Sequence, residues 1–188
     1  MSSLQSLLER IVPALKNAGV PFMVAGSFAS AAHGLPRSTN DLDIIIDPTR
    51  EALDSLLAQL PSDTYYVDAD VARDALQRRG MFNVVDHATG WKVDFIFRRN
   101  RAFSREEFER RSAMNLLGVE VLMASAEDTI LAKLEWSKAS GGSERQRRDI
   151  AGVIATLGDS LDRPYLEHWL RELDLESEWA IAQQTPIA

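Results

Sequence analysis

Residues 41–46, Asp-Leu-Asp-Ile-Ile-Ile, place two carboxylates at the start of a run of β-branched side chains. Isoleucine is enriched in strands, and residues two apart in a strand point to the same face. We therefore expect Asp41 and Asp43 to lie side by side on one face of a sheet. Leu42 and Ile44 take the opposite face, where their burial contributes to the core.

The carboxylate pair is electrostatically costly by itself. Two like charges about 4 Å apart repel by roughly 4 kcal/mol at an effective dielectric constant near 20. Asp41 and Asp43 therefore need a proton, a basic partner or a metal cation, and oxygen ligands on one face suit Mg²⁺ or Mn²⁺ better than zinc. Turn capping at a strand end is the alternative interpretation of an isolated Asp-x-Asp pair.

A third acidic residue follows on a later strand. Residues 91–97, Trp-Lys-Val-Asp-Phe-Ile-Phe, alternate as a strand in which Asp94 shares a face with Lys92 and Ile96. A carboxylate in the middle of a strongly apolar strand is costly unless it is paired or binds a cation. Asp94 is therefore either a structural residue bonded to a basic side chain or a third metal ligand.

A strand-to-helix junction precedes the acidic pair. Residues 20–25 are apolar and predict a buried strand, and residues 27–33 predict a helix of small side chains. Gly26 and Ser27 therefore lie at a helix start, where free backbone N–H groups and the positive helix end favour an anion such as a triphosphate. A simple tight turn is the alternative.

Two residues of the loop before the acidic pair, Arg37 and Thr39, either contact phosphate or a second substrate, or are solvated. A phosphate site, a carboxylate pair on the next strand and a third carboxylate later in the chain match the needs of two-metal phosphoryl transfer. One ion binds the triphosphate oxygens and the other activates an attacking hydroxyl. The order of these features predicts a metal-dependent transfer reaction.

Strands and helices interleave in the first two thirds of the chain, and helices alone follow. Strands are expected at residues 20–25, 41–46, 81–86, 91–97 and 119–123. Helices are expected at residues 4–17, 27–33, 48–60, 69–79, 125–138, 144–157 and 163–173, with Pro13 kinking or shortening the first. A hairpin joins two of the strands, so we predict an α+β fold: a small mixed sheet flanked by helices over residues 1–123 and a C-terminal helical region over residues 124–188.

The bulk composition excludes several classes of protein. The chain has 188 residues, 45% of them hydrophobic, and its lack of cysteine excludes disulfides, zinc–thiolate sites and thiol catalysis. No apolar stretch approaches the roughly 20 residues of a membrane helix, and the first nine residues do not resemble a signal peptide, so a cytoplasmic protein is expected. A net charge of −7 argues against non-specific DNA binding, and the local arginine clusters are expected to be solvated.

The motifs resemble the signature of the DNA polymerase β-type nucleotidyltransferase superfamily. That signature is an apolar residue, Gly, then Gly or Ser, a gap, Asp-x-Asp, and a third acid on a later strand. Here it reads Val-Ala-Gly-Ser at 24–27, Asp-Leu-Asp at 41–43 and Val-Asp-Phe at 93–95. The resemblance implies a nucleotidyltransferase fold and the transfer of an NMP from an NTP, ATP among them, to an acceptor hydroxyl of RNA, protein or a small molecule, with release of pyrophosphate. It also implies two Mg²⁺ or Mn²⁺ ions on Asp41, Asp43 and Asp94.

Within the superfamily, the chain is most similar to the abortive-infection type (AbiEii-like) bacterial nucleotidyltransferases. In these, a helix beginning Glu-Asp carries a lysine, and a later helix carries a basic residue followed by Asp. The matching positions are Glu127-Asp128 with Lys133, and Arg148-Asp149. The resemblance implies that Lys133 helps to hold the nucleotide phosphates, that Asp149 supports the site, and that a cognate antitoxin is a partner. The alternatives are a surface lysine and a salt bridge on the helix face.

Two classes of function therefore remain open. The first is an active transferase, either an antibiotic-modifying adenylyltransferase or a toxin that modifies RNA or protein. The second is a catalytically silent relative that acts as an interaction or antitoxin-type subunit. The three acidic residues favour the enzyme, and the sequence does not identify its acceptor or its preferred NTP.

Overall fold

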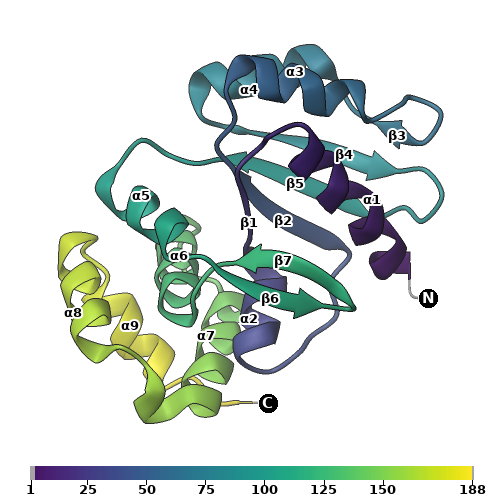
Figure 1. The fold of residues 1–188 in the computed structure, drawn as a ribbon. Coiled ribbons are helices and arrows are strands. Elements are labelled where there is room, and N and C mark those ends of the chain that lie inside the picture. The colour runs from purple at the N-terminus through teal and green to yellow at the C-terminus, as the bar shows by residue number, and fades with distance from the viewer. Residues whose placement is uncertain (1–2, 188) are drawn as a thin grey trace. The chain divides into compact units, whose positions relative to one another are not determined.

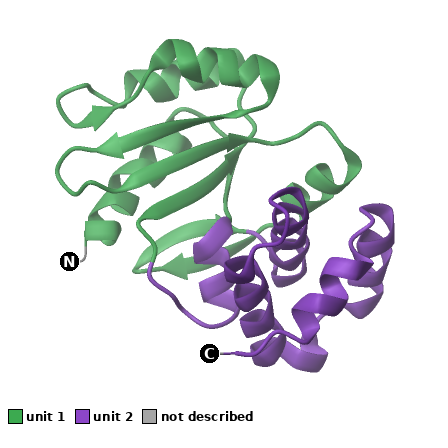
Figure 2. Ribbon diagram, turned by 180° about the vertical axis from the view of Figure 1, so that it is seen from behind, with its two compact units in different colours: residues 1–25, 39–123 green, residues 26–38, 124–188 purple. Residues whose placement is uncertain are grey.

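The computed structural model describes residues 3–187 and forms two compact units (Figure 2). The first unit contains the chain up to Ala25 and residues 39–123, and the second contains residues 26–38 and the chain from Ala124 onward. Residues 26–38 are grouped with the C-terminal helices, so the chain passes from the first unit to the second, back again and then into the second for its remainder.

The first unit is built on one seven-stranded mixed sheet (Figure 1). Its strands are β1 (Phe22–Val24), β2 (Asp41–Ile46), β3 (Tyr65–Tyr66), β4 (Met81–Asp86), β5 (Lys92–Phe97), β6 (Ser112–Leu116) and β7 (Val119–Met123), in the order β3-β4-β5-β2-β1-β7-β6. The pairs β2–β5 and β1–β7 are parallel, and the other four are antiparallel. The mixed sheet predicted from the hairpin pattern is confirmed.

The described part of the first unit also contains four α-helices: α1 (Ser3–Asn17), α3 (Arg50–Ala58), α4 (Ala69–Arg78) and α5 (Ala102–Glu109). Helix α4 contacts β4, and α1 contacts β7 and α3. Helix α1 continues through Pro13 to Asn17, so the expected shortening at this proline is absent. Its leucine and isoleucine face is fully buried, and that burial offsets the cost of about 3 kcal/mol that proline imposes inside a helix.

The core of the first unit lies on one face of β2 and β5. Alternate residues of both strands have no exposed surface, namely Leu42, Ile44, Ile46, Val93, Phe95 and Phe97. Phe82 of β4 joins them, with its ring centroid 5.1 Å from that of Phe95 and 5.8 Å from that of Phe97. The alternation that predicted these strands therefore corresponds to a buried apolar face and a polar face directed away from it.

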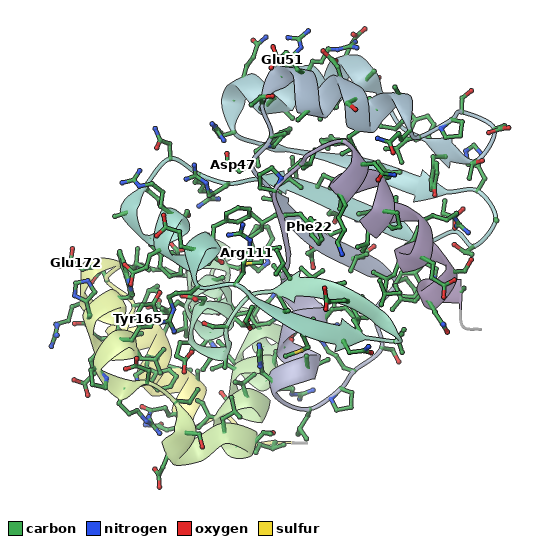
Figure 3. The ribbon with its side chains drawn as sticks, viewed as in Figure 1. Phe22, Asp47, Glu51, Arg111, Tyr165 and Glu172 are labelled. Atoms are coloured by element: carbon green, nitrogen blue, oxygen red, sulfur yellow. The ribbon has the colours of Figure 1, made fainter. Side chains whose placement is uncertain are left out.

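An ion-pair cluster lies at the C-terminal ends of β2 and β5. Asp47 follows β2 (Figure 3) and accepts hydrogen bonds from Arg79 Nη1 at 2.6 Å and Arg98 Nε at 2.9 Å. Arg98, which belongs to a cluster expected to be solvated, is mostly buried, with 15% of its side chain exposed. Its backbone N–H also donates to the carbonyl of Ile46 at 2.9 Å. These contacts hold the ends of the two strands in line.

Within residues 3–187, five elements were not predicted from the sequence: β3, α5, β6, the 3-10 helix η1 (Gly158–Ser160) and α9. Strand β6 illustrates why, because its side chains are exposed or half-buried and carry no apolar alternation. It forms by pairing with β7 across the two-residue loop Leu117-Gly118, whose φ angles of 53° and 86° have the positive signs of a type I′ turn. The hairpin geometry, rather than burial, defines this strand.

The second unit is helical. It contains α2 (Gly26–His33), α6 (Ala126–Ala139), α7 (Glu144–Leu157), α8 (Arg163–Glu172) and α9 (Glu176–Gln183). Ser125 caps α6, near the expected helix start at residue 125, by accepting from the backbone N–H of Asp128 at 3.1 Å. Asp128 is fully buried and accepts from the hydroxyl of Tyr165 on α8 at 2.5 Å (Figure 3). Among the residues that the structure describes, none of the helices combines the length and apolar character that a bilayer span requires.

The end of α2 approaches α7 so closely that only glycine fits at position 34. A Cβ atom added to Gly34 would lie 2.7 Å from the backbone nitrogen of Val153 and 2.8 Å from the carbonyl carbon of Gly152. Real side chains do not approach backbone atoms to this distance. One of the two segments would have to move to accept any other residue.

We predict that Gly34→Ala lowers the free energy of unfolding by about 1–3 kcal/mol, because the new methyl group overpacks the contact between residue 34 and α7. Chemical unfolding monitored by circular dichroism measures this change. Gly80→Ala is the matched control, since a Cβ there meets no atom within 4 Å. Equal stability of the two variants would contradict the close approach of α2 to α7.

Candidate active site

The three predicted carboxylates of the first unit lie on one face of the sheet. Strands β2 and β5 pair in parallel with Asp43 opposite Asp94 and Asp41 opposite Lys92. Opposite residues in a pair of strands direct their side chains to the same face, and so do residues two apart in one strand. Asp41, Asp43 and Asp94 therefore project together from the polar face, opposite the core residues of the same strands.

Asp94 is the most enclosed of the three carboxylates, with 8% of its surface exposed. Its Oδ1 accepts a hydrogen bond from the side-chain amide of Asn83, which lies directly opposite it on β4. Its Oδ2 lies 3.1 Å from the Nζ of Lys92. Both oxygens of this carboxylate therefore have a partner within the sheet, which explains how a charge is tolerated in a strand of apolar residues.

Lys92 connects two of the three carboxylates. Its Nζ lies 3.1 Å from Asp94 Oδ2 and 3.4 Å from Asp41 Oδ1, and 37% of its side chain is exposed. The hydrogen bond to Asp94 and the negative charges of both carboxylates raise the pKa of Lys92 above its usual value, against a smaller opposing effect of burial. The ammonium group offsets the repulsion between the carboxylates, although solvent around this exposed side chain weakens the attraction.

The donor set suits a hard divalent cation, but two of the three carboxylates, Asp41 and Asp94, are paired with the ammonium of Lys92. Carboxylate oxygens on one face are the ligands that Mg²⁺ and Mn²⁺ prefer. Within residues 3–187, no three His, Cys, Asp or Glu side chains converge closely enough to form a ready-made metal site. For Asp94 and Asp41 to hold an ion, the ammonium of Lys92 would have to leave its position beside them.

Thr39 and Ala25 frame the start of β2. The hydroxyl of Thr39 lies 3.3 Å from both the backbone nitrogen and the carbonyl oxygen of Asp41, so this side chain fixes the entry of the strand. The backbone N–H of Ala25 donates to the carbonyl of Asp43 at 3.0 Å. Ala25 is followed in the chain by Gly26, which adopts a φ of +61°, a conformation that glycine takes without steric cost.

Four predicted residues of the second unit form a charged network. Arg37 Nε donates to both oxygens of Asp149, at 2.8 and 3.1 Å, and an Nη of the same guanidinium donates to the hydroxyl of Ser27. Lys133 Nζ donates to Asp149 Oδ2 at 2.7 Å and to the side-chain oxygen of Gln146 at 2.9 Å. Two cations thus share one carboxylate beside the first turn of α2.

Burial makes this network energetically important. The side chains of Lys133 and Asp149 are 6% and 5% exposed, so Lys133 is not a surface lysine, and the salt bridges of Asp149 join it to other segments rather than to its own helix face. Burial alone would raise the pKa of Asp149, but the hydrogen bond from Arg37 and the charge of Lys133 outweigh it and lower the pKa below its usual value. The excess of one positive charge next to a helix start favours an anion.

The predicted residues therefore fall into two groups. The structure brings Asp41, Asp43 and Asp94 together on the sheet, with Thr39 at the strand entry. It separately brings together Ser27, Arg37, Lys133 and Asp149 in the helical unit, where α2 begins at Gly26.

Three further residues complete these groups: Lys92, Asn83 and Gln146. Lys92 was identifiable from its spacing, because it lies two residues before Asp94 on the same strand. Gln146 lies one helical turn before Asp149, which is a weak signal. Asn83 required the register of the β4–β5 hairpin, which the sequence does not specify.

Comparison with known proteins supports the fold. No protein-family model and no curated protein matches the sequence significantly. The solution structure of the antibiotic-resistance factor ANT(2'')-Ia matches with a TM-score of 0.59, over 98% of this chain and 97% of that chain, at 15% sequence identity. A crystal structure of ANT(2'')-Ia in complex with adenylyl-2''-tobramycin gives 0.57 over 97% and 98%, at 14% identity.

Two further solved structures share the architecture. An antigenic nucleotidyltransferase-like protein from Paracoccidioides brasiliensis has a TM-score of 0.53 over 100% of this chain and 95% of that chain, at 15% identity. The lincosamide antibiotic adenylyltransferase LnuA, with lincomycin bound, has a TM-score of 0.52 over 78% and 93%, at 13% identity. At these identities the likeness establishes the fold: this chain has the α+β fold of the nucleotidyltransferases, as the sequence motifs implied.

We predict that Asp149→Asn lowers the free energy of unfolding by about 3 kcal/mol at pH 7, because it leaves two cations without their shared carboxylate. A carboxylate with a lowered pKa stabilises the fold above its unfolded-state pKa and loses this effect as the pH falls through the folded-state pKa. The difference from the wild type should therefore be constant above about pH 5 and shrink below about pH 4. Urea unfolding at several pH values measures it.

The matched control is Asp174→Asn. Asp174 also pairs with a lysine, Lys138, at 2.7 Å, but 92% of its side chain is exposed. Little change in stability is expected there, because solvent screens exposed ion pairs. A similar loss in both variants, or a loss for Asp149→Asn that persists unchanged at pH 3, would contradict the role assigned to this carboxylate.

Proposed function

We propose that the protein is a metal-dependent nucleotidyltransferase of the DNA polymerase β-type superfamily. It transfers the NMP group of an NTP to an acceptor hydroxyl: a bond forms between the acceptor oxygen and the α-phosphorus, and the bond to the β-phosphate breaks, releasing pyrophosphate. The observation that carries the proposal is the register of β2 and β5, which sets Asp43 beside Asp94 with Asp41 on the same face, in a chain with the nucleotidyltransferase fold.

Asp41, Asp43 and Asp94 are the proposed ligands of two Mg²⁺ or Mn²⁺ ions. Bound there, the ions would neutralise charge on the transferring phosphoryl group and acidify the attacking hydroxyl. Asp41 and Asp43 would help to hold both ions, and Asp94 would help to hold one of them and would accept the proton of the acceptor hydroxyl. Asn83 holds Asp94 in place through its hydrogen bond to Oδ1.

The phosphates of the NTP are assigned to the start of α2 and its cations. Gly26 and Ser27 offer backbone N–H groups, and Arg37 and Lys133 supply positive charge. Asp149 orients both cations rather than contacting the nucleotide, and Thr39 fixes the chain just before Asp41.

The acceptor is proposed to be a small hydroxyl-bearing molecule, with ATP as the first donor to test. Two structures of similar fold support this choice: one is a complex with adenylyl-2''-tobramycin, and the other is an adenylyltransferase with bound lincomycin. A cytoplasmic location follows from the need for NTPs. The toxin interpretation, with RNA or protein as acceptor and an antitoxin as partner, is distinguished in the experiment below.

The proposal is tested by incubating the purified protein and Mg²⁺ with each α-labelled NTP and either hydroxyl-rich antibiotics, such as tobramycin or lincomycin, or cell lysate. Label on a small molecule is the expected result. Label on RNA or protein, together with growth arrest on expression, would indicate the toxin. If no label is transferred and no NTP with Mg²⁺ raises the melting temperature, the transferase proposal is wrong. That result would indicate the catalytically silent interaction subunit.

We predict that Asp43→Asn reduces the rate of transfer by at least about 100-fold, since loss of a residue that merely supports a metal ligand already costs 10–100-fold. Rates measured under saturating NTP test this. Asp70→Asn makes the same chemical change at a side chain that is 96% exposed on α4, and its rate should equal that of the wild type. Retention of activity in Asp43→Asn would remove this residue from the metal site.

A further inference from the structure

Lys92 occupies a position that the proposed transfer reaction does not use. It shares a face with Asp94, two residues later on β5, and lies opposite Asp41 on β2. Its Nζ is 3.1 Å from Asp94 Oδ2 and 3.4 Å from Asp41 Oδ1. A cation of the protein itself thus lies among the carboxylates that are assigned to divalent ions.

Lys92 and a divalent ion cannot both use Asp94 Oδ2 without repulsion. Mg²⁺ binds carboxylate oxygens at about 2.1 Å, so an ion on Oδ2 would lie within about 5.2 Å of an ammonium group that remained in its present position, 3.1 Å from that oxygen. The other oxygen, Oδ1, is engaged by the amide of Asn83. Asp94 is also mostly buried, so the carboxylate has little freedom to turn a different oxygen lone pair toward a new cation.

We propose that Lys92 is a built-in counter-ion that competes with divalent cations for Asp94 and Asp41, and that the site therefore selects a metal–nucleotide complex over the free metal. This inference rests on the proposed function. The side chain of Lys92 is 37% exposed and carries its charge on a flexible four-carbon stem, so it can withdraw into solvent without disturbing the strand.

The selectivity follows from charge. A free divalent ion must expel the ammonium group unaided, and the two positive charges repel one another. A metal bound to an NTP arrives with phosphate oxygens, and these can accept the hydrogen bonds that the ammonium group loses. Lys92 therefore penalises the free ion more than the complex. Before the complex binds, the lysine stabilises a face on which three carboxylates would otherwise repel each other.

The test measures the affinity of the wild type and of Lys92→Met for Mn²⁺ alone. Binding is monitored as the loss of the free-ion signal in electron paramagnetic resonance. The variant is expected to bind free Mn²⁺ about tenfold more tightly, which is the effect of removing one unit charge about 5 Å from a divalent ion at a solvated site. Affinity for Mn²⁺ in the presence of NTP should change less. Without metal, Lys92→Met should also melt at a lower temperature than the wild type. Mn²⁺ should remove this difference in melting temperature.

Two further variants control for the change itself. Lys138→Met removes a lysine with the same kind of ion pair, to Asp174, and should leave Mn²⁺ affinity unchanged. Lys92→Arg keeps the charge and should keep the weak binding of the free ion. Equal affinity of the wild type and Lys92→Met for free Mn²⁺ would overturn the inference, as would equal tightening in Lys92→Met and Lys92→Arg.

The same preparations separate this inference from the proposed function. If Lys92→Met gains Mn²⁺ affinity while neither protein transfers label from any NTP, the counter-ion role stands and the transferase proposal fails. If the wild type transfers label and Lys92→Met gains no Mn²⁺ affinity, the transferase proposal stands and the counter-ion role fails. Circular dichroism confirms that each variant is folded before either comparison is made.

Discussion

The parallel pairing of β2 with β5 is the constraint on which the candidate site depends. Its register sets Asp43 opposite Asp94, and a shift by one residue would send one of these side chains into the core. Two sets of contacts fix this register. Fully buried apolar residues fix it on one face of the sheet, and the arginine contacts of Asp47 fix it at the strand ends. The hydrophobic core thus indirectly positions three charged groups that it does not contain.

The charged side chains of Lys133 and Asp149 in the helical unit are more deeply buried than those of Lys92 and its acidic partners on the sheet, and they are paired differently. On the sheet, the partly exposed Lys92 pairs with two acids, and solvent is near enough to screen these pairs. In the helical unit, Lys133 and Asp149 are buried, so a missing partner would leave a charge without water or a counter-ion. Asp149 meets this constraint by bonding to Arg37 and Lys133 at once. One group of charges can therefore rearrange easily, whereas the other is expected to be rigid.

Much of the fold was predictable from the sequence because it is encoded by short-range patterns. A run of β-branched residues identified β2, alternation identified β5, and a helix was expected from residue 125, where Ser125 caps α6. The elements missed were those whose formation depends on a neighbour, such as β6, which forms only because the Leu117-Gly118 turn lays it against β7. Propensity carries little information where a strand has no buried face.

The sequence by itself determined that Asp41 and Asp43 share a face, and that Lys92 and Asp94 do too, because a strand repeats every two residues. Only the tertiary structure decided that these two pairs are neighbours, with Asp43 beside Asp94 and the ammonium of Lys92 between Asp94 and Asp41. Periodicity is a property of one segment, whereas register and ion pairing between distant segments arise from the packing of the whole sheet. The sequence of each strand therefore determines which charged groups share a face, and the packing of the sheet determines how these charges are paired.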